Sequence, residues 1–199
     1  MKLQLTPYNC YSKAITTPVF RGVVPVETIK NVNIGAMPNG VIGKIKVFKA
    51  SGKEAFLNLE KYTTSTEESY HLKDELNNIV GKIDFFFNRP VWAMDDETSH
   101  VFVKELRNFS NPNTPYYKKG LEEYRQVGTK LLQVAHKRSL ENNCEGNIEL
   151  VAKNEKAVLE FYKNLGFEQP ANITPYMNPY RLHLAKDKQS ILAQKYGGI

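Results

Sequence analysis

The stretch from Gly120 to Phe167 constrains the fold of this 199-residue chain more than any other part of it. It reads as a loop, a helix, a short apolar strand, a second helix and a closing Gly-Phe pair. Upstream of it, the run V-F-V-K-E-L at 101–106 has the character of another strand. A strand, a helix and a second strand in this order form a crossover unit, and crossover units join parallel strands. The sequence therefore predicts a mixed α/β fold.

Both helices of this stretch are visible in the spacing of apolar residues. The run V-G-T-K-L-L-Q-V-A-H-K-R-S-L has apolar residues at helical spacing and predicts a helix over residues 128–142. The run I-E-L-V-A at 148–152 is short and fits a largely buried strand. A second amphipathic pattern follows, and Gly166 is placed to end that helix.

The junction between the 101–106 strand and the first helix suits an anionic ligand. The first N–H groups of a helix have no partner within it and carry partial positive charge, so phosphate groups bind there readily. Gly128 at this start permits close approach of a ligand to the backbone. Taken alone, Gly128 fits a simple turn equally well, and the wider pattern shifts the balance.

The run Y-K-N-L-G-F at 162–167 and the run G-T-K-L-L at 128–132 resemble the GNAT superfamily of N-acetyltransferases in content and spacing. In that family a loop of the form Q/R-x-x-G-x-G/A binds phosphate and is followed by a helix, a strand and a helix ending near Y-x-x-x-G-F. The resemblance covers residues 99–186 well and the first hundred only loosely. It implies a single-domain acyl-CoA N-acyltransferase fold, with a central mixed sheet and acetyl-CoA as co-substrate.

The phosphate loop departs from the family pattern and allows two registers. In the first, which the helix pattern favours, Gly128 takes the final small position, Gln126 replaces the other glycine and Glu123 stands where Gln or Arg is usual. In the second, Arg125 opens the motif, Gly128 is its first glycine and Lys130 fills the final position. Such loops work mostly through backbone N–H groups, so side-chain changes need not abolish phosphate binding.

The resemblance also implies roles for individual residues. Tyr162 stands where the family has its general acid, and a tyrosine with its ordinary pKa of about 10 stays protonated at neutral pH, as an acid must be. The base is open between Glu105, Glu123 and a relay through water. The expected coenzyme contacts lie at the end of the 101–106 strand, at the start of the first helix and before the second helix: Leu106, Arg107, Asn108, Arg125, Gln126, Val127, Gly128, Thr129 and Asn154.

Ahead of the crossover unit the chain reads as an antiparallel meander. Strand patterns run from Val41 onward, although the run A-F-L-N-L-E-K-Y also fits a short helix. The pair Asn77-Asn78 separates two strand patterns, at 70–76 and 79–87, and predicts a tight hairpin. The two helices with which the family helps to bind its acceptor are not readable.

Three parts of unequal character make up the expected organisation. Residues 1–40 contain four prolines with many Asn and Thr, which predicts an irregular N-terminal segment packed on the domain. Residues 41–186 would form the GNAT-like domain, and residues 187–199 a C-terminal tail with a turn or two of helix.

The charge balance indicates an anionic ligand. The formal net charge is +6 and the isoelectric point about 9.1. A coenzyme with three phosphate groups satisfies that demand, and nucleic acid is not expected because the lysines are dispersed and no nucleic-acid-binding motif is present.

The cysteines and the hydropathy pattern limit the cellular compartments and partners that can be expected. Cys10 and Cys144 lie far apart without paired spacing, so neither a metal site nor a disulfide framework is expected. No apolar run of about 18 residues, signal peptide or lipidation motif is visible, which predicts a cytoplasmic protein without a membrane partner. A homodimer is compatible with the sequence.

The function expected on these grounds is acetyl-CoA-dependent N-acetyltransfer to a primary amine of a small molecule or a protein, by direct transfer. The alternative is a non-catalytic acyl-CoA-binding or protein-interaction module on the same scaffold. The irregular loop and the missing acceptor helices favour the alternative, whereas the retained 162–167 element opposes it.

Overall fold

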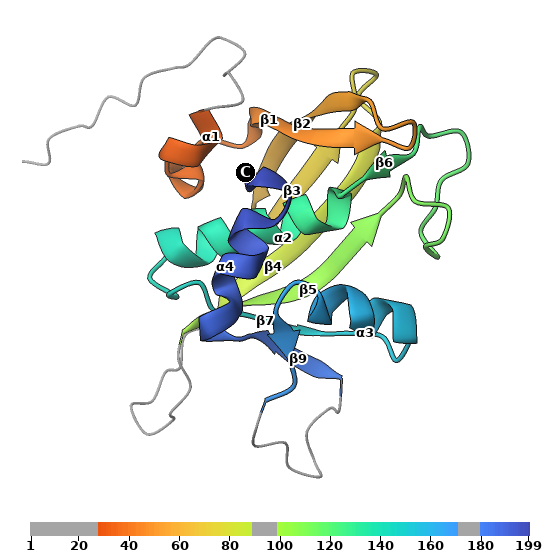
Figure 1. Ribbon diagram of the computed structural model, residues 1–199. Helices are drawn as coiled ribbons and strands as arrows, with labels where there is room; N and C mark the ends of the chain where they lie inside the picture. Colours follow the sequence, from red (N-terminus) through yellow and green to blue (C-terminus); the bar gives the residue numbers. More distant parts are fainter. Residues whose placement is uncertain (1–27, 89–98, 171–179) are drawn as a thin grey trace, which may run out of the picture.

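Nine strands form one mixed sheet in the part of the chain that the structure, a computed structural model, describes: residues 28–88, 99–170 and 180–199 (Figure 1). Their order across the sheet is β6-β1-β2-β3-β4-β5-β7-β9-β8. The strands are β1 (Gly40–Lys49), β2 (Glu54–Thr63), β3 (Glu68–Lys73), β4 (Ile79–Asn88), β5 (His100–Asn108), β6 (Tyr124–Arg125), β7 (Ile148–Val151), β8 (Phe167–Glu168) and β9 (Arg181–Leu184).

One long helix crosses the sheet, and the shorter helices lie around it (Figure 1). This helix, α2, packs on β3, β4 and β5, and α4 packs on α2. The helices are α1 (Thr28–Asn31), α2 (Val127–Glu141), α3 (Lys156–Lys163) and α4 (Gln189–Gln194), with 3-10 turns η1 (Ile34–Ala36), η2 (Lys186–Lys188) and η3 (Lys195–Gly197). No helix in the described ranges is long and apolar enough to span a membrane.

The first five strands form the predicted antiparallel meander. The A-F-L-N-L-E-K-Y run is a strand, β2, because Leu57 and Leu59 alternate into the core. The predicted hairpin is confirmed, with Asn77 at φ 66° in its turn. Its first strand ends at Lys73 instead of continuing to residue 76, because the Asp74 carboxylate accepts the Asn78 N–H at 2.8 Å and starts the turn earlier.

The crossover unit is also confirmed. β5 and β7 pair in parallel, with Val101 opposite Ile148, and α2 connects them. α2 begins and ends one residue before the range that the spacing predicts. Beyond α3, the antiparallel pair β8 and β9 completes the sheet. The expected fold class, a mixed sheet with an antiparallel N-terminal meander and a C-terminal strand-helix-strand-helix-strand unit, is therefore correct.

The predictions for the N-terminal segment fall partly outside the described residues. Residues 1–27, most of the predicted irregular segment, are not among them. Residues 28–36 form α1 and η1. Within residues 28–88 no helix is longer than the four residues of α1, so the two acceptor helices of the family have no counterpart there.

A buried ionic cluster fastens α2 to the sheet. Arg138 in α2 donates to both carboxylate oxygens of Glu68 in β3, at 2.8 and 2.7 Å, and to Glu141 at 2.6 Å. Tyr70 donates to the same Glu68 carboxylate at 2.8 Å. Burial by itself would raise the pKa of Glu68, but the hydrogen bonds and charge of Arg138 lower it. Glu68 is therefore held ionised within the core.

The same cluster anchors η1. Glu141 accepts the backbone N–H groups of Ile34 at 3.0 Å and Gly35 at 3.1 Å. From the other side, the buried ammonium of Lys61 in β2 donates to the carbonyls of Ile34, Gly35 and Met37 at 3.4, 2.7 and 3.0 Å. A Cβ at Gly35 would lie 2.0 Å from the Arg138 guanidinium, so the contact requires glycine.

We expect Arg138→Met to lower the free energy of unfolding by about 3–5 kcal/mol, because it leaves the Glu68 charge buried without its cation. Urea denaturation of both proteins measures the difference. The matched control is Arg181→Met, which breaks the pair with Glu149 at a partly exposed site and should cost about 1 kcal/mol or less. The double variant Arg138→Met/Glu68→Leu should regain part of the loss. An equal loss in Arg138→Met and the control would contradict the cluster's role.

Candidate functional site

The sheet opens between β5 and β7. The two strands pair over three positions, Val101 to Val103 of β5, and β5 then continues to Asn108 while β7 ends at Val151. At that point β5 has a bulge, because Asp84 of β4 pairs with Glu105, the next residue Phe85 pairs with Val103, and Lys104 is left over. Bulges bend a strand and increase its twist. Among the described residues no strand pairs with this side of β5 beyond Val103, so its backbone edge is open to an extended ligand.

Three of the predicted coenzyme residues, Leu106, Arg107 and Asn108, lie on this open part of β5. These three residues are not equally free to bind a ligand. The Asn108 carbonyl already accepts the Thr114 hydroxyl at 2.7 Å, and its side chain accepts from Ser110. The open edge available to a ligand is thus mainly that of Leu106 and Arg107.

Arg125, Gln126, Val127, Gly128 and Thr129 form the last residue of β6 and the first turn of α2. No side chain caps this helix, and its first backbone hydrogen bond runs from Lys130 N–H to the Gln126 carbonyl at 2.9 Å. The N–H groups of Val127, Gly128 and Thr129 therefore lack a helical partner, which is the arrangement that binds anions.

Gln126 has left-handed backbone angles, φ 72° and ψ −1°. Glycine adopts this conformation most readily. The geometry is consistent with the register in which Gln126 replaces the first glycine of the phosphate loop and Gly128 takes its final small position.

Gly128 is where β5, α2 and α3 meet. A Cβ built on Gly128 would lie 3.3 Å from the ring of Phe161 in α3 and 3.9 Å from Leu106 in β5. The structure thus brings the predicted phosphate loop close to the end of β5, where coenzyme contacts are also predicted, and α3 packs against both. A larger residue at this position would occupy the space between the three elements.

Tyr162 lies on α3 and is 9% exposed. Its ring makes edge contacts with Phe161 and Phe167, with centroids 5.1 and 5.6 Å apart. The hydroxyl makes no hydrogen bond within the described part of the chain. Burial, and to a smaller extent nearby Tyr116, raise the pKa of Tyr162 to about 12. The phenol is consequently a neutral donor at physiological pH.

Tyr116, from the long loop between β5 and β6, bridges the two sides of the opening. Its ring lies between two cations, with the Arg107 guanidinium carbon 4.8 Å and the Lys153 ammonium 5.4 Å from the ring centroid. Arg107 belongs to β5, whereas Lys153 follows β7. The loop is held in this position by a hydrogen bond from Lys118 N–H to the Phe109 carbonyl at 2.9 Å. The sequence does not predict this aromatic bridge, because nothing in it indicates which aromatic ring a lysine after a short strand will contact.

Glu105 is the end of a polar row on the side of the sheet opposite the core. Its carboxylate pairs with Lys82 at 2.8 Å and with Arg107. Lys82 also pairs with Asp84 at 2.7 Å, and Asp84 accepts the Ser69 hydroxyl at 2.6 Å. The alternation of polar residues along β3 and β4 is the sequence signal that could have grouped them.

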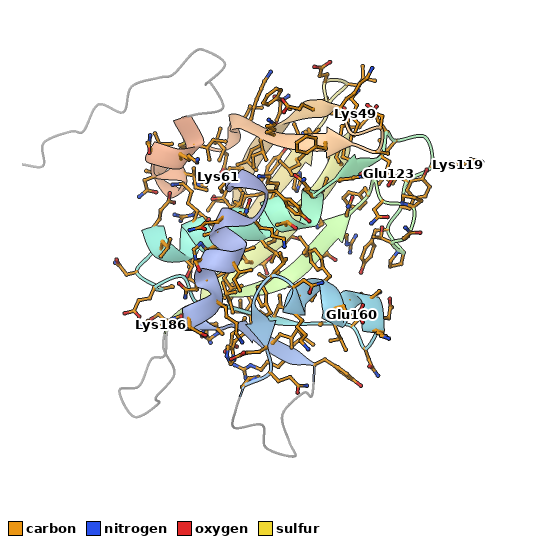
Figure 2. All side chains as sticks on the ribbon, viewed as in Figure 1. Lys49, Lys61, Lys119, Glu123, Glu160 and Lys186 are labelled. Carbon is orange, nitrogen blue, oxygen red and sulfur yellow. The ribbon has the colours of Figure 1, made fainter. Side chains whose placement is uncertain are left out.

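For Asn154 and Glu123, the structure shows no contact with this convergence among the described residues. Asn154 is exposed in the turn before α3 and makes no hydrogen bond in the described ranges. Glu123 lies beside the ends of β1 and β6, well away from Glu160 of α3 in Figure 2, and its carbonyl accepts the Ala50 N–H at 2.9 Å. No group of three or more His, Cys, Asp or Glu side chains in the described chain is arranged to hold a metal ion.

No family model matches the chain, and no curated protein sequence matches it. Several solved structures are similar to it. One is an acetyltransferase of the GNAT family from Staphylococcus aureus, 18% identical, with a TM-score of 0.41, covering 59% of this chain and 66% of that one. Another is a KacTA–DNA complex, 18% identical, with a TM-score of 0.45, covering 67% and 76%.

A third is a variant of the spermidine N-acetyltransferase SpeG from Vibrio cholerae, 12% identical, with a TM-score of 0.38, covering 63% of this chain and 67% of that one. Acetyltransferases, one of them named as a GNAT protein, are thus among the solved structures to which this chain is similar in fold.

Proposed function

We propose that the protein is an acetyl-CoA-dependent N-acetyltransferase that transfers an acetyl group directly to a primary amine. The observation that supports this most is the convergence at Gly128 of an open strand edge, an uncapped helix start and the helix that carries Tyr162. These three elements supply the groups that a thioester coenzyme and its leaving thiolate require.

The residues present fit such a coenzyme. The unpartnered N–H groups of Val127, Gly128 and Thr129 suit its pyrophosphate, since backbone N–H groups and the helix dipole both favour negative charge. The backbone of Leu106 and Arg107 suits the amide-bearing pantetheine arm, which can hydrogen-bond along an open strand edge. When bound, the coenzyme would supply an activated acetyl group.

Tyr162 would act as the general acid. As the amine nitrogen bonds to the acetyl carbon, the carbon–sulfur bond breaks and the departing sulfur takes up a proton. The pKa of about 12 keeps the Tyr162 hydroxyl protonated, and the hydroxyl has no competing hydrogen bond within the described residues. Glu105 would accept the amine proton, directly or through water, because its carboxylate lies on the same bulged part of β5. Lys82 and Arg107 hold it in place.

One observation favours the alternative, a non-catalytic acyl-CoA-binding or interaction module. The Tyr116 ring lies across the opening between Arg107 and Lys153, and Tyr162 is buried behind it. A catalytic protein has to move Tyr116 aside, whereas an interaction module does not.

The first test of this proposal is coenzyme binding. Calorimetric titration of the purified protein with acetyl-CoA and with free CoA should show micromolar binding of both. Gly128→Leu should weaken both by about tenfold or more, because its side chain would be forced against Phe161 into the coenzyme space. The control is Gly120→Leu, since a Cβ at Gly120 meets nothing within 4 Å; its φ of +94° strains the loop, so its folding is checked first. Absence of binding at millimolar coenzyme would favour the interaction module.

The second test is the acid. With an amine acceptor found by screening, Tyr162→Phe should lower kcat by about a hundredfold with little change in coenzyme affinity, because only the proton donor is lost. Deprotonation of the Tyr162 hydroxyl should not lower the activity of the wild type until the pH approaches about 12, where its raised pKa lies. Tyr117→Phe, at a more exposed tyrosine of the same loop as Tyr116, is the control. Unchanged turnover in Tyr162→Phe removes this residue from the mechanism.

A further inference from the structure

A cavity of about 620 Å³ lies between α1, the edge of β1, the start of α2 and the C-terminal residues 196–199. Leu106, Tyr116, Phe161 and Tyr162, which surround the coenzyme opening, do not line it. The edge of β1 is accessible here because β6 pairs only with its last two residues. The volume is within the range of about 300–1,000 Å³ that small-molecule sites occupy.

The charged side chains that line this cavity are all positive. Lys30, Lys44, Lys46 and Lys130 line it, and no Asp or Glu side chain does. Lys46 pairs with a glutamate of β2, but in the described chain the ammonium groups of Lys30 and Lys44 have no ion pair. Ile199 also lines the cavity, and its carboxylate is not within ion-pair distance of these lysines. The four lysines outnumber this single carboxylate, and a concave surface with an excess of one charge attracts ligands of the other sign.

Lys130 is the buried member of the group, with 2% of its surface exposed. Its ammonium donates to the carbonyls of Tyr196, at 3.0 Å, and Gly198. An ammonium has three donors, so two carbonyls leave one for a ligand. Lys130 lines the cavity together with Tyr196 and Gly198.

The comparison with Lys61 shows what Lys130 lacks. Lys61 is similarly buried, and burial lowers its pKa, but it donates to three carbonyls and the nearby Glu68 charge opposes that lowering. The charged neighbours of Lys130 are Lys30 and Lys46, and burial together with these two cations lowers its pKa to about 8. Lys61 has the carboxylate of Glu68 nearby. An anion bound in the cavity would give Lys130 a comparable negative neighbour.

The rest of the lining suits an organic group attached to that anion. Ile29, Ile45 and Phe48 present apolar surface. The side-chain oxygen of Gln126 is buried without a hydrogen-bond partner in the described residues, and Gln126 is one of the residues that line the cavity. A buried acceptor of this kind is costly unless a donor reaches it, and a ring N–H or a sugar hydroxyl is such a donor.

We propose that this cavity binds an organic phosphate of nucleotide size, with its phosphates at Lys30, Lys44 and Lys130 and its ring system against Ile45 and Phe48. The site goes beyond the acetyltransferase proposal and does not depend on it. The coenzyme opening uses the backbone at the start of α2, whereas this cavity uses side chains from α1, β1 and the outer side of α2.

The test is calorimetric titration of the full chain with ADP at low salt. The double variant Lys30→Gln/Lys44→Gln should bind ADP about tenfold more weakly or worse, because two charge-assisted contacts are lost. Lys156→Gln/Lys186→Gln is the matched control: it removes the same charge from two highly exposed lysines elsewhere and should bind like the wild type. Thermal melts of all three proteins show that the lysine changes leave the fold intact.

Two further measurements separate this site from the coenzyme opening. Gly128→Leu should keep its ADP affinity while it loses affinity for CoA, and inorganic phosphate alone should bind more weakly than ADP. The proposal is overturned by loss of ADP binding in Gly128→Leu, by equal weakening in the two lysine pairs, or by no ADP binding at millimolar concentration. Equal affinity for phosphate and ADP would remove the organic part of the assignment.

Discussion

The short parallel contact between β5 and β7 is the constraint on which the rest of the structure depends. Among the described residues, three residue pairs between strands join the antiparallel meander to the C-terminal strands, and the bulge at Lys104 follows immediately. If the β5–β7 ladder continued, the backbone N–H and C=O groups of β5 on this side would hydrogen-bond to β7. Because the ladder stops, the same backbone is left for a ligand, and α2 and α3 close the opening from its two sides.

The buried ionic cluster lies at the end of α2 that is away from this opening. Arg138, Glu68 and Glu141 hold the far end of α2 against β3 through several charge-assisted hydrogen bonds. Breaking a buried pair of this kind costs far more than breaking a surface pair. The last turns of α2 are thus fixed by ionic contacts, while its first turn is left uncapped. The helix is anchored at the end that does not face the ligand.

The sequence was sufficient for the features that follow from local periodicity. The α2 and β7 patterns, the Asn77 turn and the order of the crossover unit could all be derived from spacing, because each depends on neighbours within a few residues. The Tyr116 bridge could not, since it joins a loop to the ends of two strands that are distant in sequence. Nor could the different fates of Lys61 and Lys130, because a lysine's burial depends on which carbonyls the tertiary fold brings to it.

For the same reason, the structure brings some of the predicted site residues together and leaves others without contact to them. Leu106, Gly128 and the residues beside them are brought together because short segments of regular structure carry them to one place. Asn154 is exposed in the turn before α3 and makes no hydrogen bond in the described residues. The position of a turn residue of this kind is set by the tertiary fold and not by local periodicity.

The two proposed sites share the first turn of α2, and this has an energetic consequence. Gln126 lies at the start of the helix and is also one of the residues that line the lysine-lined cavity. Anions on both sides would compete for the same partial positive charge of the helix, and they repel each other within the Debye length of about 8 Å at physiological salt. Filling of the Gln126 acceptor by a ligand would instead stabilise the left-handed conformation that the phosphate loop needs. Since binding linkage is reciprocal, whichever of these effects is larger sets the sign with which each ligand changes the affinity for the other.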